Sequence, residues 1–388
     1  MNFIEQEMPK AGDTVAVGLS GGVDSTLTAM LLKEKGCHVI GVTMSVWDGR
    51  LPENVDLSTL PASCYGPSAL KNIEDTKKFC AEQNIEYHVI DVKDLFRQKI
   101  LNYFTSEYRN GRTPNPCIQC NYKIKFGALI EGIERLGINF DYFCTGHYAR
   151  IVKPEEGLWK SNQKPCMIQT ASDASKDQTY FLYRIPSQTL EKVRFPLAGI
   201  KKSDVFKMAK ERNLAAADKA ESQDFAPEQF RDMFFSDKPS VPGKIIDLDG
   251  KELGYHNGIE HYTVGQRRGL GIALSYPVYV HSIDASTNTV ILAKNEDLNC
   301  DGLYADDFVW PANIVPPEEF EAFVKIRLAS KPVKAKIIKD NLQYKVIFEN
   351  PQRAVAPGQS LVIYTESGVI LGGGIIKKAI QSPRNIEQ

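Results

Sequence analysis

The sequence has no excess of charge of either sign and no long apolar run. Lysine and arginine number 47 against 48 aspartates and glutamates, so no overall positive field attracts the chain to nucleic acid. No stretch reaches the roughly 18 consecutive apolar residues of a membrane span. The first residues, which include Glu5 and Glu7, do not form a signal peptide. We expect a cytoplasmic protein with neither a membrane nor DNA as partner, whose affinity for RNA, if any, comes from local patches.

What is present is the composition of an ordinary globular protein. Hydrophobic residues make up 43% and charged residues 24% of the 388 residues, a length that suggests two or three domains. The 8 cysteines of a cytoplasmic chain are expected to be reduced thiols, metal ligands or catalytic groups, and not a disulfide framework.

The first half of the chain alternates strand-like and helix-like segments. The expected strands are Thr14–Gly18, His38–Met44, Tyr87–Val92 and Tyr142–Thr145. The expected helices are a segment ending before Gly36, Ile73–Asn84 and Tyr122–Leu136. Repeated βα units of this length predict an α/β domain with a parallel, doubly wound sheet, which binds ligands at the carboxyl ends of its strands.

The pattern changes after about residue 217. Residues 218–277 consist of short helices, turns and a glycine-rich stretch, and from 278 onward short alternating strands follow one another. That second pattern is typical of a small antiparallel barrel. The sequence therefore predicts an α/β domain over 1–217, a small central domain over 218–277 and a C-terminal antiparallel β-barrel over 278–388.

A glycine-rich loop lies between the first strand and the first helix. It reads Gly18-Leu-Ser-Gly-Gly-Val-Asp-Ser25 and lacks the Gly-Lys-Ser/Thr ending of a Walker loop. Gly21 and Gly22 allow the backbone to approach an anion closely, and the helix N-terminus supplies free N–H groups. The loop is similar to the pyrophosphate loop of the N-type ATP pyrophosphatases, a group with an adenine nucleotide alpha hydrolase-like fold. That similarity implies an adenylating enzyme.

A pair of cysteines, Cys117 and Cys120, stands just ahead of the helix expected from Tyr122. A cysteine there, with Lys123 and Lys125 nearby, is expected to have a lowered pKa and to be a reactive thiolate. The pair is also compatible with half of a zinc site or with a redox couple. No second cysteine pair of matching spacing is present, and we favour sulfur-handling chemistry.

Eight motifs, in order, then give the chain a close resemblance to the tRNA-specific 2-thiouridylase family, which replaces the C2 oxygen of the wobble uridine with sulfur. They are GLSGGVDS (18–25), RTPNPCIQCNYKIKF (112–126), TGHYAR (145–150), SKDQTYFL (175–182), ESQDF (221–225), HYTVGQRRGLGI (261–272), VKIRL (324–328) and APGQ (356–359). The resemblance implies ATP and Mg²⁺ as cofactors, and tRNA and a sulfur donor or persulfide carrier as partners.

The resemblance also implies roles for individual residues. Cys120 matches the catalytic nucleophile, with Cys117 and Asp24 as further catalytic residues. The residues implied to hold ATP are Gly18, Leu19, Ser20, Gly21, Gly22, Val23, Asp24, Ser25, Met44 and Gly146. The residues implied to meet the target base or the rest of the tRNA are Asn115, Pro116, Cys117, His147, Lys176, Asp177, Gln178, Arg327, Leu328 and Gln359.

The chain departs from the family pattern at its cysteines. Members usually carry a second cysteine just after the ESQD segment, and here Ala226 stands at that position. A [4Fe–4S] cluster held by Cys117, Cys120 and Cys144, with Cys64 as an alternative third ligand, is one hypothesis for sulfur delivery. A pairing of Cys117 with Cys120 without metal is the other.

Two further alternatives concern the activity as a whole. Another adenylating ligase would require an amine nucleophile, and no ammonia-producing segment is evident. A catalytically silent tRNA-binding protein would not need the intact glycine loop and Cys120. A run of lysines and arginines over 325–353 predicts a tRNA-binding face on the barrel, and the basic loop at 261–272 predicts either a phosphate clamp or a mere connection.

Overall fold

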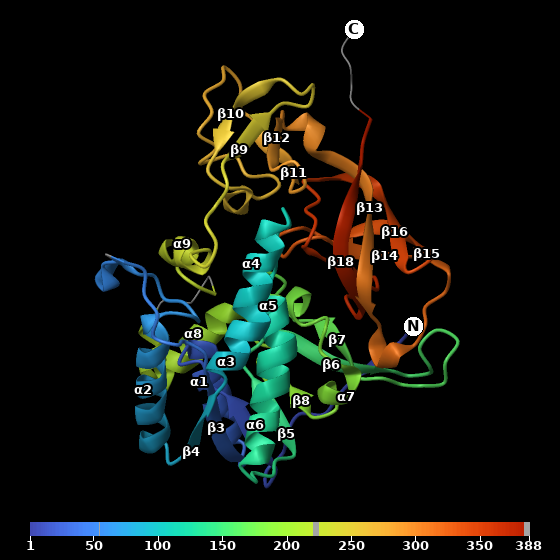
Figure 1. Cartoon of the computed structure of the whole chain (residues 1–388). Helices are drawn as coiled ribbons and strands as arrows, with labels where there is room; N and C mark the ends of the chain where they lie inside the picture. Colours follow the sequence, from blue (N-terminus) through green and yellow to red (C-terminus); the bar gives the residue numbers. More distant parts are fainter. Residues whose placement is uncertain (54, 220–224, 384–388) are drawn as a thin grey trace.

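The computed structural model describes residues 1–53, 55–219 and 225–383, which form three parts (Figure 1). An α/β domain occupies the lower left of the view, a small sheet lies above it, and a β-barrel stands to the right. The predicted architecture is therefore confirmed. No helix in the described part of the chain is long and apolar enough to cross a membrane.

The α/β domain is built on a five-stranded sheet whose paired strands all run parallel. The strand order is β4 (Glu86–Asp91), β3 (His38–Ser45), β2 (Thr14–Gly18), β5 (Tyr142–Thr145) and β8 (Val193–Arg194). The chain leaves the central strand β2 toward β3 on one side and later adds β5 on the other. This reversal creates the switch point at which such sheets bind ligands.

Helices cover both faces of this sheet. Helices α1 (Val23–Glu34) and α2 (Pro67–Glu82) pack on one face, where Val15 and Val17 of β2 are buried. The opposite face is covered by a continuous helical segment made of α5 (Pro116–Gln119), a π-helical stretch (Cys120–Ala128) and α6 (Leu129–Arg135). The other α-helices in the described part of the chain are α3 (Lys93–Phe96), α4 (Asn102–Arg109), α7 (Ser187–Leu190), α8 (Lys202–Glu211) and α9 (Arg231–Phe234).

Three further sheets are found among the described residues. A small antiparallel sheet joins β1 (Phe3–Glu5), β6 (Ala149–Pro154) and β7 (Met167–Thr170). The central sheet has the order β10 (Glu252–His256), β9 (Gly243–Ile246), β12 (Thr289–Ala293) and β11 (Tyr279–Asp284). The closed barrel has the order β13 (Asn299–Val309), β16 (Gln343–Arg353), β15 (Val333–Asp340), β14 (Glu319–Lys325), β17 (Ser360–Tyr364) and β18 (Ile370–Gln381).

One assignment made from the sequence differs from the structure. Strands β11 and β12 were expected to open the barrel, but β12 pairs in parallel with β9 of the central sheet. Val280, Val290 and Leu292 are buried in the core of that sheet together with Ile245 and Tyr262. Alternating apolar residues indicate a strand without indicating its sheet, because the partner strand is set by tertiary packing.

Candidate active site

The glycine loop lies at the carboxyl end of β2 and leads directly into α1. Gly21 has a φ of +78°, a left-handed conformation that favours glycine, and Gly22 is the N-cap of the helix without any side-chain cap. The backbone N–H of Ser20 donates to the Ser25 Oγ at 3.1 Å, and the Ser25 Oγ donates to the Gly22 carbonyl at 3.1 Å. These bonds hold the loop closed around the uncapped helix start, which suits an anion.

An ion pair sits beside this loop. The Lys202 ammonium, on a side chain only 8% exposed, lies 2.6 and 2.7 Å from the two carboxylate oxygens of Asp24. The Tyr148 hydroxyl donates to the same carboxylate at 2.8 Å. Asp24 is therefore engaged by two side chains of the protein, and it holds a buried cation next to the loop.

The neighbouring strand ends contribute the residues expected beside the nucleotide. Gly146 follows β5, and a methyl group there would lie 2.7 Å from the Asp24 carbonyl carbon and 2.8 Å from the Ser25 nitrogen. Met44 lies near the carboxyl end of β3 and packs between two apolar clusters. Both residues lie at the edge of the sheet that carries the loop.

Cys120 stands at the start of the π-helical stretch, one turn into the segment that begins with α5. Asn115 caps this segment, because its side-chain oxygen accepts the Ile118 N–H at 3.3 Å. Pro116 occupies the first helical position, where its missing N–H costs nothing. Departures from regular α-helix of this kind recur at functional sites.

The expected lowering of the Cys120 pKa is wrong. The pKa of the thiol is raised to about 12, mainly by burial, with the Lys125 ammonium acting to lower it and negative charge on Cys64 and Cys117 acting to raise it. Sequence reasoning counted the helix start and the lysines but not the desolvation of the thiol, which is the largest contribution.

This environment predicts how Cys120 reacts in the free enzyme. Alkylation by iodoacetamide, followed at Cys120 by peptide mapping, should accelerate about tenfold per pH unit between roughly pH 7 and 9.5, because only the thiolate reacts. The unfolded protein should instead level off near the ordinary cysteine pKa of about 8.5. A plateau below pH 8 in the native protein would show that the thiol is ionised, contrary to its burial.

His147 contacts Lys125, which lies on the same helical segment as Cys120. Its Nδ1 lies 2.7 Å from the Thr145 hydroxyl and its Nε2 lies 3.3 Å from the Lys125 nitrogen, and its ring packs against Phe126 and Phe195. Burial and the nearby ammonium hold the pKa of His147 well below its usual value. The imidazole is therefore neutral and is held at the carboxyl end of β5.

The proposed cluster ligand Cys144 is in the wrong place. Side chains alternate along a strand, so Phe143 faces the segment that carries Cys120, while Cys144 is fully buried with Cys37 and Cys80 beneath α1 and α2. Among the described residues, no group of three His, Cys, Asp or Glu side chains is placed to hold a metal ion. The described residues therefore do not fit a [4Fe–4S] cluster held by Cys117, Cys120 and Cys144.

The loop that precedes Cys120 lies where the three parts of the chain meet. Gln359 of the barrel donates two hydrogen bonds to it, to the carbonyls of Thr113 at 3.1 Å and of Pro114 at 3.2 Å. The Thr113 N–H donates to the Pro357 carbonyl at 2.8 Å. A methyl group at Gly111 would lie 3.0 Å from Ile283 of the central sheet. We call residues 111–114 with residues 357–359 the junction.

The other residues expected to contact tRNA are spread over two regions. Asp177 accepts hydrogen bonds from the Ala171 N–H and the Thr179 hydroxyl, and Gln178 accepts one from the Tyr148 N–H. Their side chains thus bind the protein itself, beside the partly buried Lys176. On the barrel, Arg327 donates to the Arg353 carbonyl at 3.3 Å, and Leu328 is exposed.

The roles of two residues and one contact of the site were missed by sequence reasoning. Lys202 and Tyr148 both bind Asp24, and Lys125 contacts His147. Each contact joins segments that are distant in the chain, so the sequence does not indicate it. Residues 220–224, which carry most of the ESQDF motif, lie outside the described residues. Phe225 and Ala226, which follow, are described.

A parallel sheet with a glycine loop at its switch point defines a nucleotide-binding domain of the adenine nucleotide alpha hydrolase class. Family models agree with this class: "tRNA methyl transferase HUP domain" matches residues 13–226, "tRNA methyl transferase PRC-barrel domain" matches 234–294, and "Aminomethyltransferase beta-barrel domain" matches 300–376. The second match includes β11 and β12, in agreement with their place in the central sheet.

Curated relatives are similar to almost the whole chain. The tRNA-specific 2-thiouridylase MnmA of Endomicrobium trichonymphae is 41% identical over 93% of this chain and 98% of its own length. The MnmA of Carboxydothermus hydrogenoformans is 39% identical over 94% of this chain and 98% of its own length. The chain belongs to the tRNA-specific 2-thiouridylase family.

Proposed function

We propose that this protein uses ATP to replace the C2 oxygen of the wobble uridine of tRNA with sulfur. The observation that carries the proposal is that two chemistries lie at the carboxyl ends of the same sheet. The anion-binding glycine loop follows β2, and Cys120 packs in a cluster with Val46 and Trp47, which follow β3. The relatives of the chain are named for this reaction. Those names favour this reading over an adenylating ligase that uses an amine.

The first step activates the base. The residues fit ATP, because the uncapped start of α1 offers N–H groups to the phosphates and the Gly22 position leaves room for them. The uridine leaves the anticodon stack, at a cost of about a few kcal/mol. Its O2 attacks the α-phosphate and pyrophosphate departs. Mg²⁺ would neutralise the negative charge of the departing pyrophosphate. Lys202 and Asp24 form an ion pair of zero net charge, which fixes the position of the Lys202 ammonium beside the loop.

The second step transfers sulfur. A persulfide carrier places a sulfur atom on Cys120, whose terminal sulfur then attacks C2 of the activated base, and AMP leaves. The neutral His147 and Lys125 lie in the same region and supply a hydrogen-bonding and a cationic group beside the reacting atoms. A cytoplasmic location forms part of the proposal, since tRNA and ATP are found there.

Mass spectrometry of the wobble uridine tests the proposal directly. The protein, incubated with tRNA, ATP, Mg²⁺ and a persulfide donor, should form 2-thiouridine together with equal amounts of AMP and pyrophosphate. Cys120→Ser should still release pyrophosphate in the presence of tRNA but form no thiolated base. A wild-type protein that binds tRNA without releasing pyrophosphate would be the silent binding protein considered as an alternative.

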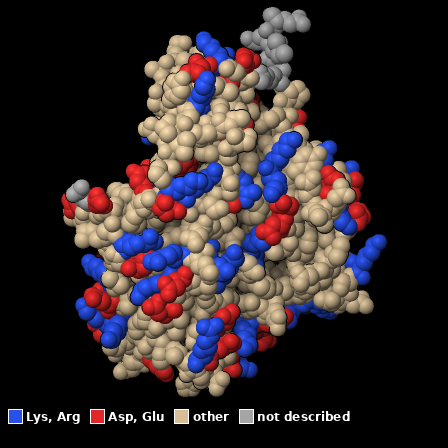
Figure 2. Space-filling model, viewed as in Figure 1, with Lys and Arg blue, Asp and Glu red and all other residues tan. Residues whose placement is uncertain are grey.

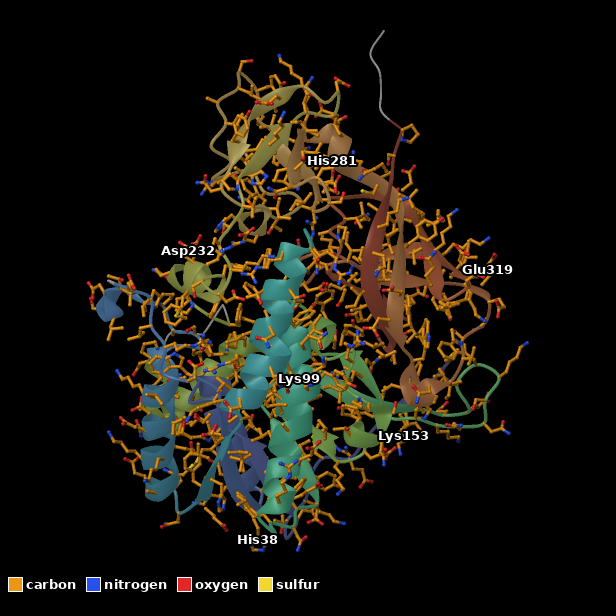
Figure 3. All side chains as sticks on the ribbon, in the orientation of Figure 1. His38, Lys99, Lys153, Asp232, His281 and Glu319 are labelled. Carbon is orange, nitrogen blue, oxygen red and sulfur yellow. The ribbon has the colours of Figure 1, made fainter. Side chains whose placement is uncertain are left out.

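Contact with tRNA is proposed to depend on the basic loop more than on the barrel strands. Lys334 and Lys336 of β15 are paired with Glu321 and Glu319 of β14 at 2.8 and 2.6 Å. Glu319 is labelled on the outer side of the barrel in Figure 3, and acidic and basic residues mingle over the visible face of the barrel in Figure 2. The local positive charge expected there is largely neutralised.

The basic loop, residues 261–272, differs in this respect. Arg267 and Arg268 are exposed, and among the described residues neither forms an ion pair. Replacing both by Gln should weaken tRNA binding and lower the salt slope of log K by about 2, since each lost phosphate contact removes about 1. The matched pair Lys334→Gln and Lys336→Gln should change the slope far less. Filter binding across a salt series measures both, and the opposite ranking would restore the barrel face as the phosphate contact.

A further inference from the structure

Ala226 stands at the position where family members usually carry a second cysteine, and it lies near Cys120. Ala226 is 8% exposed and lies in an apolar cluster with Tyr65 and Phe230, against which Cys120 also packs. A methyl group performs no thiol chemistry. The reaction proposed above nevertheless needs a group that separates the sulfur of the product from the sulfur of Cys120.

Cys64 lies on the segment that runs beside Ala226. The N–H of the next residue, Tyr65, donates to the Phe225 carbonyl at 2.7 Å, and a methyl group at Gly66 would lie 3.7 Å from the Pro227 Cδ. Residues 64–66 therefore lie alongside residues 225–227. The Cys64 thiol is therefore on a segment that adjoins the position at which the second thiol is absent.

This segment is held in place by a charged network. The Tyr65 hydroxyl donates to Asp48 at 2.7 Å, and Asp48 is bound in turn by Arg50 at 3.0 Å and by Arg97 at 2.5 Å. The hydrogen bonds from Arg97 and Tyr65 lower the pKa of Asp48 to about 2 against its burial, so the carboxylate is charged at neutral pH. Tyr65, the neighbour of Cys64, is thus held both by its side chain, through Asp48, and by its backbone, through Phe225.

Cys64 also shares its electrostatic surroundings with Cys120. Burial raises the pKa of both thiols, a negative charge on Cys64 raises the pKa of Cys120 further, and the Lys125 ammonium lowers both pKa values. Cys64 is exposed on one side, so a reductant can reach it, whereas most of the other cysteines are buried in separate cores. Those are Cys37, Cys80, Cys144, Cys166 and Cys300.

We infer that Cys64 is the resolving thiol that releases the thiolated base from Cys120. The inference rests on the proposed function. After the terminal sulfur of the persulfide has bonded to C2 and AMP has left, the base and Cys120 are joined by a sulfur–sulfur bond. The Cys64 thiolate attacks the Cys120 Sγ. A Cys64–Cys120 disulfide forms, the bond to the base breaks, and its electron pair stays on the C2 sulfur.

The electrons and protons of this step balance, and a dithiol reductant is the one further reactant that the cycle requires. Cys64 and Cys120 lose two electrons together, and the transferred sulfur gains them as it becomes the thiocarbonyl of the product. The proton of the Cys64 thiol passes to solvent, and the base takes up one proton at N3. A dithiol reductant then returns both cysteines to thiols before the next turnover.

A single turnover without reductant tests the inference. Protein carrying the persulfide on Cys120 is mixed with tRNA and ATP, and the wild type should release thiolated tRNA and gain a Cys64–Cys120 disulfide by peptide mapping. Cys64→Ser should instead accumulate tRNA covalently bound to Cys120, and added dithiothreitol should release it as thiolated tRNA. Cys300→Ala, changed in the distant barrel, serves as the matched control and should behave as the wild type.

Three outcomes would overturn the inference. The first is release of thiolated tRNA by Cys64→Ser at the wild-type rate. The second is a wild-type disulfide that maps to Cys117 and Cys120. The third is iron and sulfide in the anaerobically purified protein that disappear in Cys64→Ser. Failure of the proposed function itself is distinct, because the wild type would then form no AMP with tRNA present.

Discussion

Gly22→Ala is expected to reduce tRNA-dependent pyrophosphate release by on the order of a hundredfold or more, while the protein remains folded. The φ of Gly22 is −88°, which alanine adopts easily, and the nearest heavy atom to a new methyl group is the Ser20 Oγ at 3.6 Å. The protein accommodates the methyl group, but the phosphates of ATP must approach the same N-cap position. The free energy of unfolding should change by less than about 1 kcal/mol.

Gly21→Ala is the matched control, because it should lower the stability of the protein, whereas Gly22→Ala should impair the approach of ATP. Its φ of +78° strains any L side chain, and the methyl group would lie 3.0 Å from the Asn72 Cβ. We expect a loss of about 1–2 kcal/mol in the free energy of unfolding, measured by denaturant titration. Full pyrophosphate release by a folded Gly22→Ala protein would remove the loop from the reaction.

Gln359→Ala should lower kcat for thiolation by roughly 10- to 100-fold and leave KM for tRNA almost unchanged. The side chain donates to two carbonyls of the loop before Asn115, so its loss frees the segment that positions Cys120. Single-turnover and steady-state kinetics with a full tRNA separate the two constants. The resemblance instead implies that Gln359 contacts tRNA, and that role would raise KM.

Gln359→Glu sharpens this test. A carboxylate of nearly the same shape has no N–H to donate and would face the two carbonyl oxygens of Thr113 and Pro114. A positioning role therefore predicts that the Glu variant is at least as impaired as the Ala variant. Near-normal kcat with a raised KM in both variants would assign Gln359 to tRNA binding.

Local sequence patterns predict the core of the α/β domain well and its connections poorly. The strands Thr14–Gly18 and Tyr142–Thr145 coincide with β2 and β5, because both are apolar runs bounded by polar or glycine residues. The helical segment formed by α3 and α4 was not predicted. Its charged and polar residues obscure the apolar positions Phe96, Ile100 and Phe104 that it buries.

The residues of the site likewise divide into those that a local sequence pattern indicates and those that only the folded structure brings together. The glycine loop is a local feature, so the residues that form it are found from sequence. The helix expected from Tyr122 instead begins at Pro116, so Cys117 and Cys120 lie within the helical segment and not ahead of it. Lys202 pairs with Asp24 across 178 positions of the chain, and no motif connects the two. Cys144 was misplaced because its position in the sequence, beside Thr145, says nothing about the face of the sheet to which it points. Burial, which raises the Cys120 pKa, is likewise a property of the assembled fold.

The junction has a thermodynamic consequence for substrate selection. Because the barrel and the reaction loop are joined by Gln359 and by the Thr113–Pro357 backbone bond, a change in one is transmitted to the other. Linkage makes such coupling reciprocal: if a tRNA body bound outside the reaction loop favours one conformation of that loop, a base bound at the loop must strengthen binding of the body by the same factor. This coupling free energy is gained only when both parts of the same tRNA are bound. An isolated anticodon fragment would therefore bind more weakly than the anticodon of a full tRNA does.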